Sequence, residues 1–263
     1  YESACRLKPR DGALRLEFAR ELAGRGETER ASQTLREYCE AVRGDSSQAA
    51  NAALAYGELA LLDPGDPAWP IGRANAERQA GDDQSAMLHY VEAARWFRLA
   101  SAPAAEPPLP PLSGRQFDAA GWIDGAIGAY RSALEIAPDD ESVRTELAEC
   151  LAQAGRAAEA ESERGRLAES ARLRADWETE ARHLEALLAA NPERVAERAR
   201  LAEIRLTQGD LASAARHWTL SAEACSLAQD WERAIESARR VREINPGDLR
   251  CRRLLAAALA QQN

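Results

Sequence analysis

The stretch from Pro192 to Pro246 indicates the fold of this chain: PERVAERARLAEIRLTQGDLASAARHWTLSAEACSLAQDWERAIESARRVREINP. It divides into three amphipathic runs, separated by Gly209-Asp210 and by Asp230 and closed by Asn245-Pro246. Small and apolar residues recur within each run at three- and four-residue steps, which is the spacing of one helix face. Glycine favours a helix end, aspartate a helix start, and proline prevents continuation. The stretch therefore predicts three consecutive helices and a stop.

The same punctuation recurs along the chain. Four prolines are each followed 17 residues later by a glycine, and each glycine is followed five residues later by an alanine. These pairs are Pro9 and Gly26, Pro64 and Gly81, Pro138 and Gly155, and Pro192 and Gly209. These four prolines and Pro246, called the phasing prolines, lie 55, 74, 54 and 54 residues apart. Such spacing indicates internal structural repeats, of which the second holds about 20 extra residues.

One part of the chain resembles a known family specifically. The residues that carry the resemblance are Gly121-Trp122, Ala126, Tyr130, Ala133 and Pro138, followed by Leu147-Ala148, Leu151 and Gly155. This run is similar to the tetratricopeptide repeat pattern, and weaker matches extend from about Pro9 to the end. That family repeats at 34 residues, whereas this variant has about 54 residues and three helices per unit. The resemblance implies an all-α fold, an α-α solenoid of tetratricopeptide-like helical repeats with a concave surface for protein segments.

A proline-rich segment interrupts the second unit. Ser101 to Arg115 holds five prolines, which exclude a helix and favour extended polyproline II. We interpret it as a surface loop or linker, with a ligand for a proline-binding domain as the less favoured alternative. The predicted organisation is N-terminal helical repeats over 1–100, the proline-rich loop or linker over 101–115, and C-terminal helical repeats over 116–263. If this segment is a flexible hinge, residues 1–100 and 116–263 form two lobes. If it packs on the helices, the chain forms one array.

The start of the second unit departs from the repeat. Pro67 and Pro70 crowd the beginning of its first helix, and Arg73 and Glu77 fall where leucine-like residues pack in other units. We therefore expect this helix to be short, shifted or edge-exposed. The tryptophans Trp122, Trp177 and Trp231 each open a third helix in the repeat phase, where we expect them to pack in the core.

Composition narrows the function classes. A net charge of −9 and a pI near 5.1 disfavour nucleic acid and anionic membranes as partners, because both need a basic face. The five cysteines lack close paired spacing, so we expect buried free thiols, which favour a reducing compartment. No segment has the roughly 20 apolar residues of a membrane span. We expect a cytoplasmic protein, with a periplasmic or membrane-tethered location as the alternative if an N-terminal signal is missing.

The sequence offers no catalytic constellation. Acidic residues are evenly spread, and His89 and His217 occupy matching repeat positions, with His183 in a similar setting before an apolar residue. Equivalent positions in successive repeats do not converge on one ion. We therefore expect no enzyme activity, no catalytic residue, no metal site and no cofactor.

The resemblance also nominates binding positions. If the family's concave-face positions transfer, they lie four, seven, eleven and fourteen residues after each phasing proline. The candidate partner-binding residues are Asn75, Arg78, Glu149, Glu203, Arg250 and Arg253. Small residues such as Ala196 and Ala199 lie between them, a pattern that suits a helix or extended segment of a protein partner. A C-terminal carboxylate ligand is disfavoured, because Ile71 precedes Asn75 and no lysine is at hand.

The sequence supports two candidate functions. The first is a non-enzymatic protein–protein interaction scaffold or adaptor, with protein partners and a place in a larger complex. The alternative is a sensor or regulatory arm of a larger enzyme or transcription regulator whose active domain lies outside this chain. This alternative is suggested by the last predicted helix, because no following helix covers its Leu254, Leu255 and Leu259.

Overall fold

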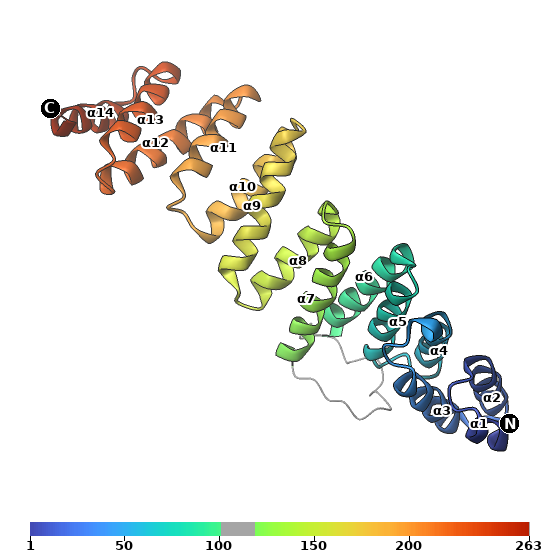
Figure 1. Cartoon of the computed structure of the whole chain (residues 1–263). Helices are drawn as coiled ribbons and strands as arrows, with labels where there is room; N and C mark the ends of the chain where they lie inside the picture. The colour runs from blue at the N-terminus through green and yellow to red at the C-terminus, as the bar shows by residue number, and fades with distance from the viewer. Residues whose placement is uncertain (101–118, 263) are drawn as a thin grey trace. The chain divides into compact units, whose positions relative to one another are not determined.

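The computed structural model describes residues 1–100 and 119–262, and within these ranges every regular element is helical (Figure 1). The predicted all-α helical-repeat fold is confirmed. The chain falls into two compact units, Tyr1–Arg156 and Ala157–Asn263.

Consecutive helices pack against one another in the N-terminal unit. Its elements are α1 (Glu2–Leu7), α2 (Gly12–Gly24), α3 (Thr28–Ala41), the 3-10 turn η1 (Ser46–Gln48), α4 (Ala49–Leu62), α5 (Ala68–Gln79), α6 (Asp83–Ala100), α7 (Ala119–Ile136) and α8 (Glu141–Gln153). Leu35, Tyr38 and Leu59 are fully buried in its core. Helices α6 and α7, which flank residues 101–118 in sequence, lie side by side (Figure 1). The proline-rich segment itself lies outside the described residues, so the three-part division remains a prediction.

The C-terminal unit contains the stretch from which the fold was predicted. Its helices are α9 (Ala157–Leu173), α10 (Trp177–Ala190), α11 (Val195–Thr207), α12 (Leu211–Leu227), α13 (Trp231–Ile244) and α14 (Leu249–Gln262). The three runs between Pro192 and Pro246 are α11, α12 and α13. Helices α8, α11 and α14 begin at 141, 195 and 249, in steps of 54 residues. Trp218, Ala222 and Val241 lie in the core of this unit.

The predicted punctuation residues form the turns. Gly26, Gly81, Gly155 and Gly209 have φ between +73° and +83°, a left-handed conformation that glycine adopts without steric cost. Aspartates cap many helix starts by accepting from the backbone N–H three residues later, at 3.0 to 3.3 Å. These caps are Asp11, Asp82, Asp140, Asp176, Asp210, Asp230 and Asp248. Each satisfies a donor that a helix start leaves unpaired.

Of the alternatives expected for α5, edge exposure was wrong, and the helix begins one residue later in the repeat than its counterparts. The helix runs over twelve residues, only slightly shorter than its counterparts α8 and α11, and buries Trp69, Ala74 and Ala76. Glu77 is also buried, and its carboxylate accepts from Arg73 Nε at 2.9 Å and contacts His89 Nδ1 at 2.6 Å. A polar network thus replaces the leucine-like contacts of other units.

The cysteines behave as expected. All five, Cys5, Cys39, Cys150, Cys225 and Cys251, are free and buried. Burial raises the pKa of the Cys39 thiol to about 12 and that of the Cys150 thiol to about 11. These thiols are therefore neutral core residues at neutral pH.

Candidate protein-binding grooves

The N-terminal unit contains a groove of about 810 Å³, which we call the N-terminal groove. Side chains of α3, α4, α5 and α6 line it, together with the turns that follow α3 and α4. The predicted residues Asn75 and Arg78 both lie in its lining. Its volume falls in the roughly 300–1,000 Å³ range of ligand pockets. Two candidates nominated by repeat position are therefore brought together on one concave surface.

Four of the residues that line this groove are aromatic. Tyr56 of α4 stacks on Trp69 of α5, with ring centroids 6.5 Å apart and an interplanar angle of 30°. A Cβ at Gly72 would lie 2.6 Å from Cδ1 of Tyr56, so this glycine lets the ring pack onto the backbone of α5. The guanidinium of Arg36 lies over the Trp69 ring at 5.0 Å, within the range of a cation–π contact.

The predicted pair is anchored by neighbours. Asn75 Oδ1 accepts a hydrogen bond from the hydroxyl of Tyr90, and Arg78 Nη1 pairs with Glu135 at 2.8 Å. Burial raises the pKa of Tyr90, although Arg78 opposes this effect. Tyr90 therefore stays a neutral donor that fixes the orientation of the Asn75 amide.

Three buried polar atoms of the groove lining lack a hydrogen-bond partner in the described part of the chain. They are Arg36 Nε, Asp66 Oδ2 and Trp69 Nε1. Asp66 is 3% exposed and Trp69 8%. The other carboxylate oxygen of Asp66 accepts from the Ala68 N–H at 2.9 Å, at the start of α5. An unsatisfied buried polar group costs about 1–3 kcal/mol, so each of these atoms gains from a partner.

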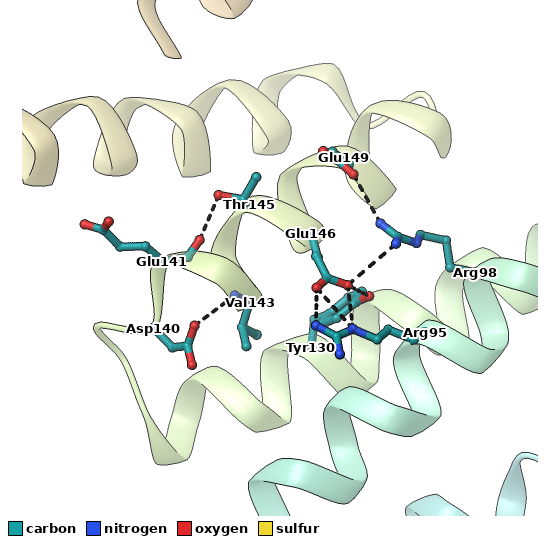
Figure 2. Close-up of polar contacts among 9 residues, drawn as sticks. All are labelled: Arg95, Arg98, Tyr130, Asp140, Glu141, Val143, Thr145, Glu146 and Glu149. Carbon is teal, nitrogen blue, oxygen red and sulfur yellow. Dashed lines mark hydrogen bonds and ion pairs between the residues drawn. The ribbon is translucent and has the colours of Figure 1, made fainter. Parts of the chain in front are cut away.

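The candidate Glu149 lies elsewhere, in an ion-pair cluster that joins α6, α7 and α8 (Figure 2). Its carboxylate accepts from Arg98 at 3.1 Å. Next to it, Glu146 accepts from Arg95 Nη2 at 2.6 Å and from the buried Tyr130 hydroxyl at 2.5 Å (Figure 2). Burial alone would raise the pKa of Glu146, but the hydrogen bonds from Arg95 and Tyr130 lower it overall. This cluster holds helices together and does not line the N-terminal groove.

The C-terminal unit has its own, smaller groove. Two cavities of about 280 and 170 Å³ share Glu203, Trp218 and Arg240 in their linings, and Ala196 and Ala199 line the smaller one. The structure thus brings the predicted Glu203 and the two small residues together. We call these cavities the C-terminal groove.

Trp177 corrects one sequence expectation. It begins α10, but its side chain is 43% exposed and lines the C-terminal groove, so its predicted core role was wrong. Arg200 lies 5.2 Å above its ring and pairs with the buried Glu180 at 2.7 and 3.0 Å. By contrast Trp122 is buried, and it lies in the first turn of α7 and not at its first residue.

The last two candidates lie on α14 and line neither groove. Arg250 pairs with Glu223 at 2.5 Å. Arg253 is exposed and forms no ion pair with a residue that the structure describes. A partner-binding role for the six candidates remains a prediction, and the structure favours Asn75, Arg78 and Glu203 by their positions.

The histidines have different surroundings despite their matching positions. His89 faces the carboxylate of Glu77, whereas Arg205 occupies the equivalent repeat position near His217. Burial and the charge of Arg198 lower the pKa of His217, and its Nδ1 has no partner among the described residues. Within residues 1–100 and 119–262, no three His, Cys, Asp or Glu side chains group as metal ligands do. No helix of these residues is long and apolar enough to cross a membrane.

A comparison with models of known protein families agrees with this architecture. The family model described as Tetratricopeptide repeat matches residues 119–179, which span α7, α8, α9 and the start of α10. The tetratricopeptide-repeat assignment made from Trp122, Ala126 and Tyr130 is therefore confirmed for residues 119–179. No curated protein matches the chain.

Several solved structures are similar to the chain at low identity. One is a tetratricopeptide repeat protein from Parabacteroides merdae, with 14% identity over 87% of this chain and 98% of that chain and a TM-score of 0.22. A thermophilic protein of the same type from Thermus thermophilus has 16% identity, coverage of 95% and 99%, and a TM-score of 0.21. The TPR2AB domain of yeast Sti1, solved as a complex with pHSP90, has 14% identity, coverage of 87% and 98%, and a TM-score of 0.22.

Proposed function

We propose that this chain is a protein–protein interaction scaffold that binds segments of partner proteins in its grooves. Helical-repeat proteins are used in this way because their stacked helices present extended binding surfaces. The observation that carries the proposal is the N-terminal groove, where Asn75 and Arg78 share the lining with aromatic rings and with buried polar atoms that have no partner among the described residues. We further propose that the protein works in the cytoplasm without chemistry of its own, in keeping with its free buried thiols.

A peptide selection tests this function. A random-sequence peptide library is panned against the intact chain, and the affinities of the enriched peptides are measured by fluorescence anisotropy. We expect the double variant Asn75→Ala with Arg78→Ala to weaken groove-bound peptides about tenfold, the equivalent of about 1.4 kcal/mol. The matched control is Arg25→Ala, which removes an exposed arginine that pairs with Glu21 on the same unit.

The C-terminal groove is tested in parallel with Glu203→Ala, and circular dichroism confirms that each variant is folded. Enrichment of peptides whose binding depends on either groove supports the scaffold function. Failure to enrich any peptide, or binding that none of these substitutions alters, would refute it.

A further inference from the structure

The kind of partner segment that suits the N-terminal groove is indicated first by its rings. Tyr56, Trp69, Tyr90 and Phe97, from three successive helices, all line it. Tyr56 is half-buried, and the other three residues border the groove with a small part of their surface. Proline-rich segments dock in aromatic-lined grooves, where they bury flat apolar ring faces. Their polyproline II helix is already formed in the free peptide, so binding costs little ordering entropy.

The hydrogen-bonding groups of the lining point the same way. Donating side chains outnumber purely accepting ones: the donors are Arg36, Arg43, Trp69, Asn75, Arg78 and Gln79, and the carboxylates are Glu40 and Asp66. Proline has a carbonyl but no N–H, so a proline-rich segment offers almost only acceptors. A donor-rich surface complements such a ligand better than it complements a strand or helix.

Trp69 supplies a specific anchor for one of these carbonyls. Its indole Nε1 is a buried donor without a partner in the described chain. Arg36, which lies over the ring, is held by Asp63 at 3.4 Å, and its side chain is 30% exposed. The ion pair with Asp63 is long, so Arg36 can leave its cation–π contact with the Trp69 ring and let a ligand carbonyl reach the indole.

The carboxylates of the groove lining indicate a second feature of the ligand, a basic residue beside its prolines. Asp66 Oδ2 is a buried acceptor that lacks a partner among the described residues, and Glu40 is an exposed carboxylate of the same lining. A prolyl carbonyl cannot donate to either one. A basic residue next to the proline run satisfies them, because a charge-assisted hydrogen bond to a carboxylate is stronger than a neutral one.

We propose that the N-terminal groove binds a proline-rich segment of a partner protein in the polyproline II conformation. One prolyl carbonyl accepts a hydrogen bond from Trp69 Nε1, and a basic residue beside the run faces Asp66. This inference rests on the proposed scaffold function, because it specifies which segment the groove takes.

Two synthetic peptides test the inference: a capped decaproline that ends in arginine, and a glycine–serine peptide of equal length with the same arginine. Binding to the intact chain is measured by fluorescence anisotropy, and the indole N–H signals are followed by 1H–15N NMR. We expect the proline peptide alone to bind and to shift the Trp69 signal, which is assigned from its loss in Trp69→Phe. That variant keeps an aromatic ring, removes the donor, and should weaken binding about two- to tenfold.

Trp231→Phe is the matched control, because it removes an indole that lines neither groove and should leave the affinity unchanged. Absence of binding by the proline peptide at millimolar concentration overturns the inference, as does binding that leaves both the Trp69 signal and the Trp69→Phe affinity unaltered. If selected library peptides bind through Asn75 and Arg78 but carry no prolines, this inference fails while the scaffold function stands. Circular dichroism shows whether Trp69→Phe retains the fold.

Discussion

Arg252 donates two hydrogen bonds to the carbonyl oxygen of Pro246, from Nε at 2.9 Å and from Nη2 at 2.6 Å. Arg144 and Arg198 each donate one hydrogen bond, from Nη2, to the carbonyls of Pro138 and Pro192. In each case the arginine lies six residues after a phasing proline, near the start of the next helix. The guanidinium therefore ties the turn to the helix that follows it.

We expect Arg252→Gln to loosen the first turn of α14, because two hydrogen bonds to Pro246 are lost. Both bonds share one acceptor and the side chain is exposed, so the cost should be about 0.5–1.5 kcal/mol, the net worth of a single intramolecular hydrogen bond. Amide hydrogen exchange at Cys251 measures the effect. The control is Arg253→Gln on the same helix, which removes an exposed arginine without an ion pair to the described chain; equal exchange in the two variants would contradict this prediction.

A second prediction concerns two glycines of α7. A Cβ at Gly125 would lie 2.6 Å from Cε1 of Phe97 on α6, whereas a Cβ at Gly128 has open space. Gly125→Ala should therefore destabilise the unit by about 1–3 kcal/mol through overpacking. Gly128→Ala should stabilise the helix by about 0.5–1 kcal/mol. Urea unfolding followed by fluorescence measures both, and a shift of the same sign in the two variants would argue against the close crossing.

Gln229 precedes Asp230 with a φ of +60°, and Ala175 precedes Asp176 with a φ of +55°. A non-glycine residue in this left-handed region is strained by about 1–2 kcal/mol. Glycine removes the strain, and its larger conformational entropy in the unfolded chain cancels only part of that gain. We expect Gln229→Gly to raise the free energy of unfolding by about 0.5–1 kcal/mol. The converse change, Gly209→Ala at φ +80°, should lower it. Thermal unfolding compares them, and a destabilised Gln229→Gly protein would disprove the argument.

The ionised Glu146 stabilises the N-terminal unit above its lowered pKa. Because the folded pKa is depressed, this stabilisation is present above the usual glutamate value of 4.5 and is lost as the pH falls through the folded pKa. Glu146→Gln should cost about 1–3 kcal/mol at pH 7, since Arg95 and Tyr130 lose a charged acceptor. The difference from the wild type should shrink on acidification. Urea titrations measure it, with Glu21→Gln on the exposed face of α2 as control; a constant difference across pH would count against the assignment.

His217 gives the C-terminal unit a different pH dependence. Its folded pKa lies below the ordinary value of 6.5, so the unfolded chain binds the proton more readily. Stability should be complete above that value and should decline as the pH falls below it. His217→Gln should flatten this decline between pH 7 and about pH 5 when thermal unfolding is measured. An identical dependence of stability on pH in the variant would contradict this prediction. So would a His217 pKa above 6.5 in an NMR titration.

The helices were predictable because their limits depend on local signals. Pro192, Gly209 and Asp210 act on the backbone within a turn of where they stand. Asn75 and Arg78 were nominated from the concave-face positions of the resembled family, and both lie in the lining of the N-terminal groove. The exposure of Trp177 depends on how neighbouring helices pack, which a local pattern does not contain. Trp69 was missed because the prolines around it obscure the repeat. An arginine six residues after four of the five phasing prolines could be noticed in the sequence, but the bond of Arg144, Arg198 and Arg252 to the proline carbonyl becomes evident only in three dimensions.

The turn between helices is specified within a very short span. From Pro138 to Arg144, and again from Pro246 to Arg252, one segment holds the breaker, the aspartate that starts the next helix and the arginine that returns to the proline. Such a segment contains all the residues that form the junction. A module that is duplicated by unequal recombination, or inserted by design, therefore brings with it the residues that form its own turn. Arrays of this kind can therefore grow or contract by whole modules without redesign of the junctions.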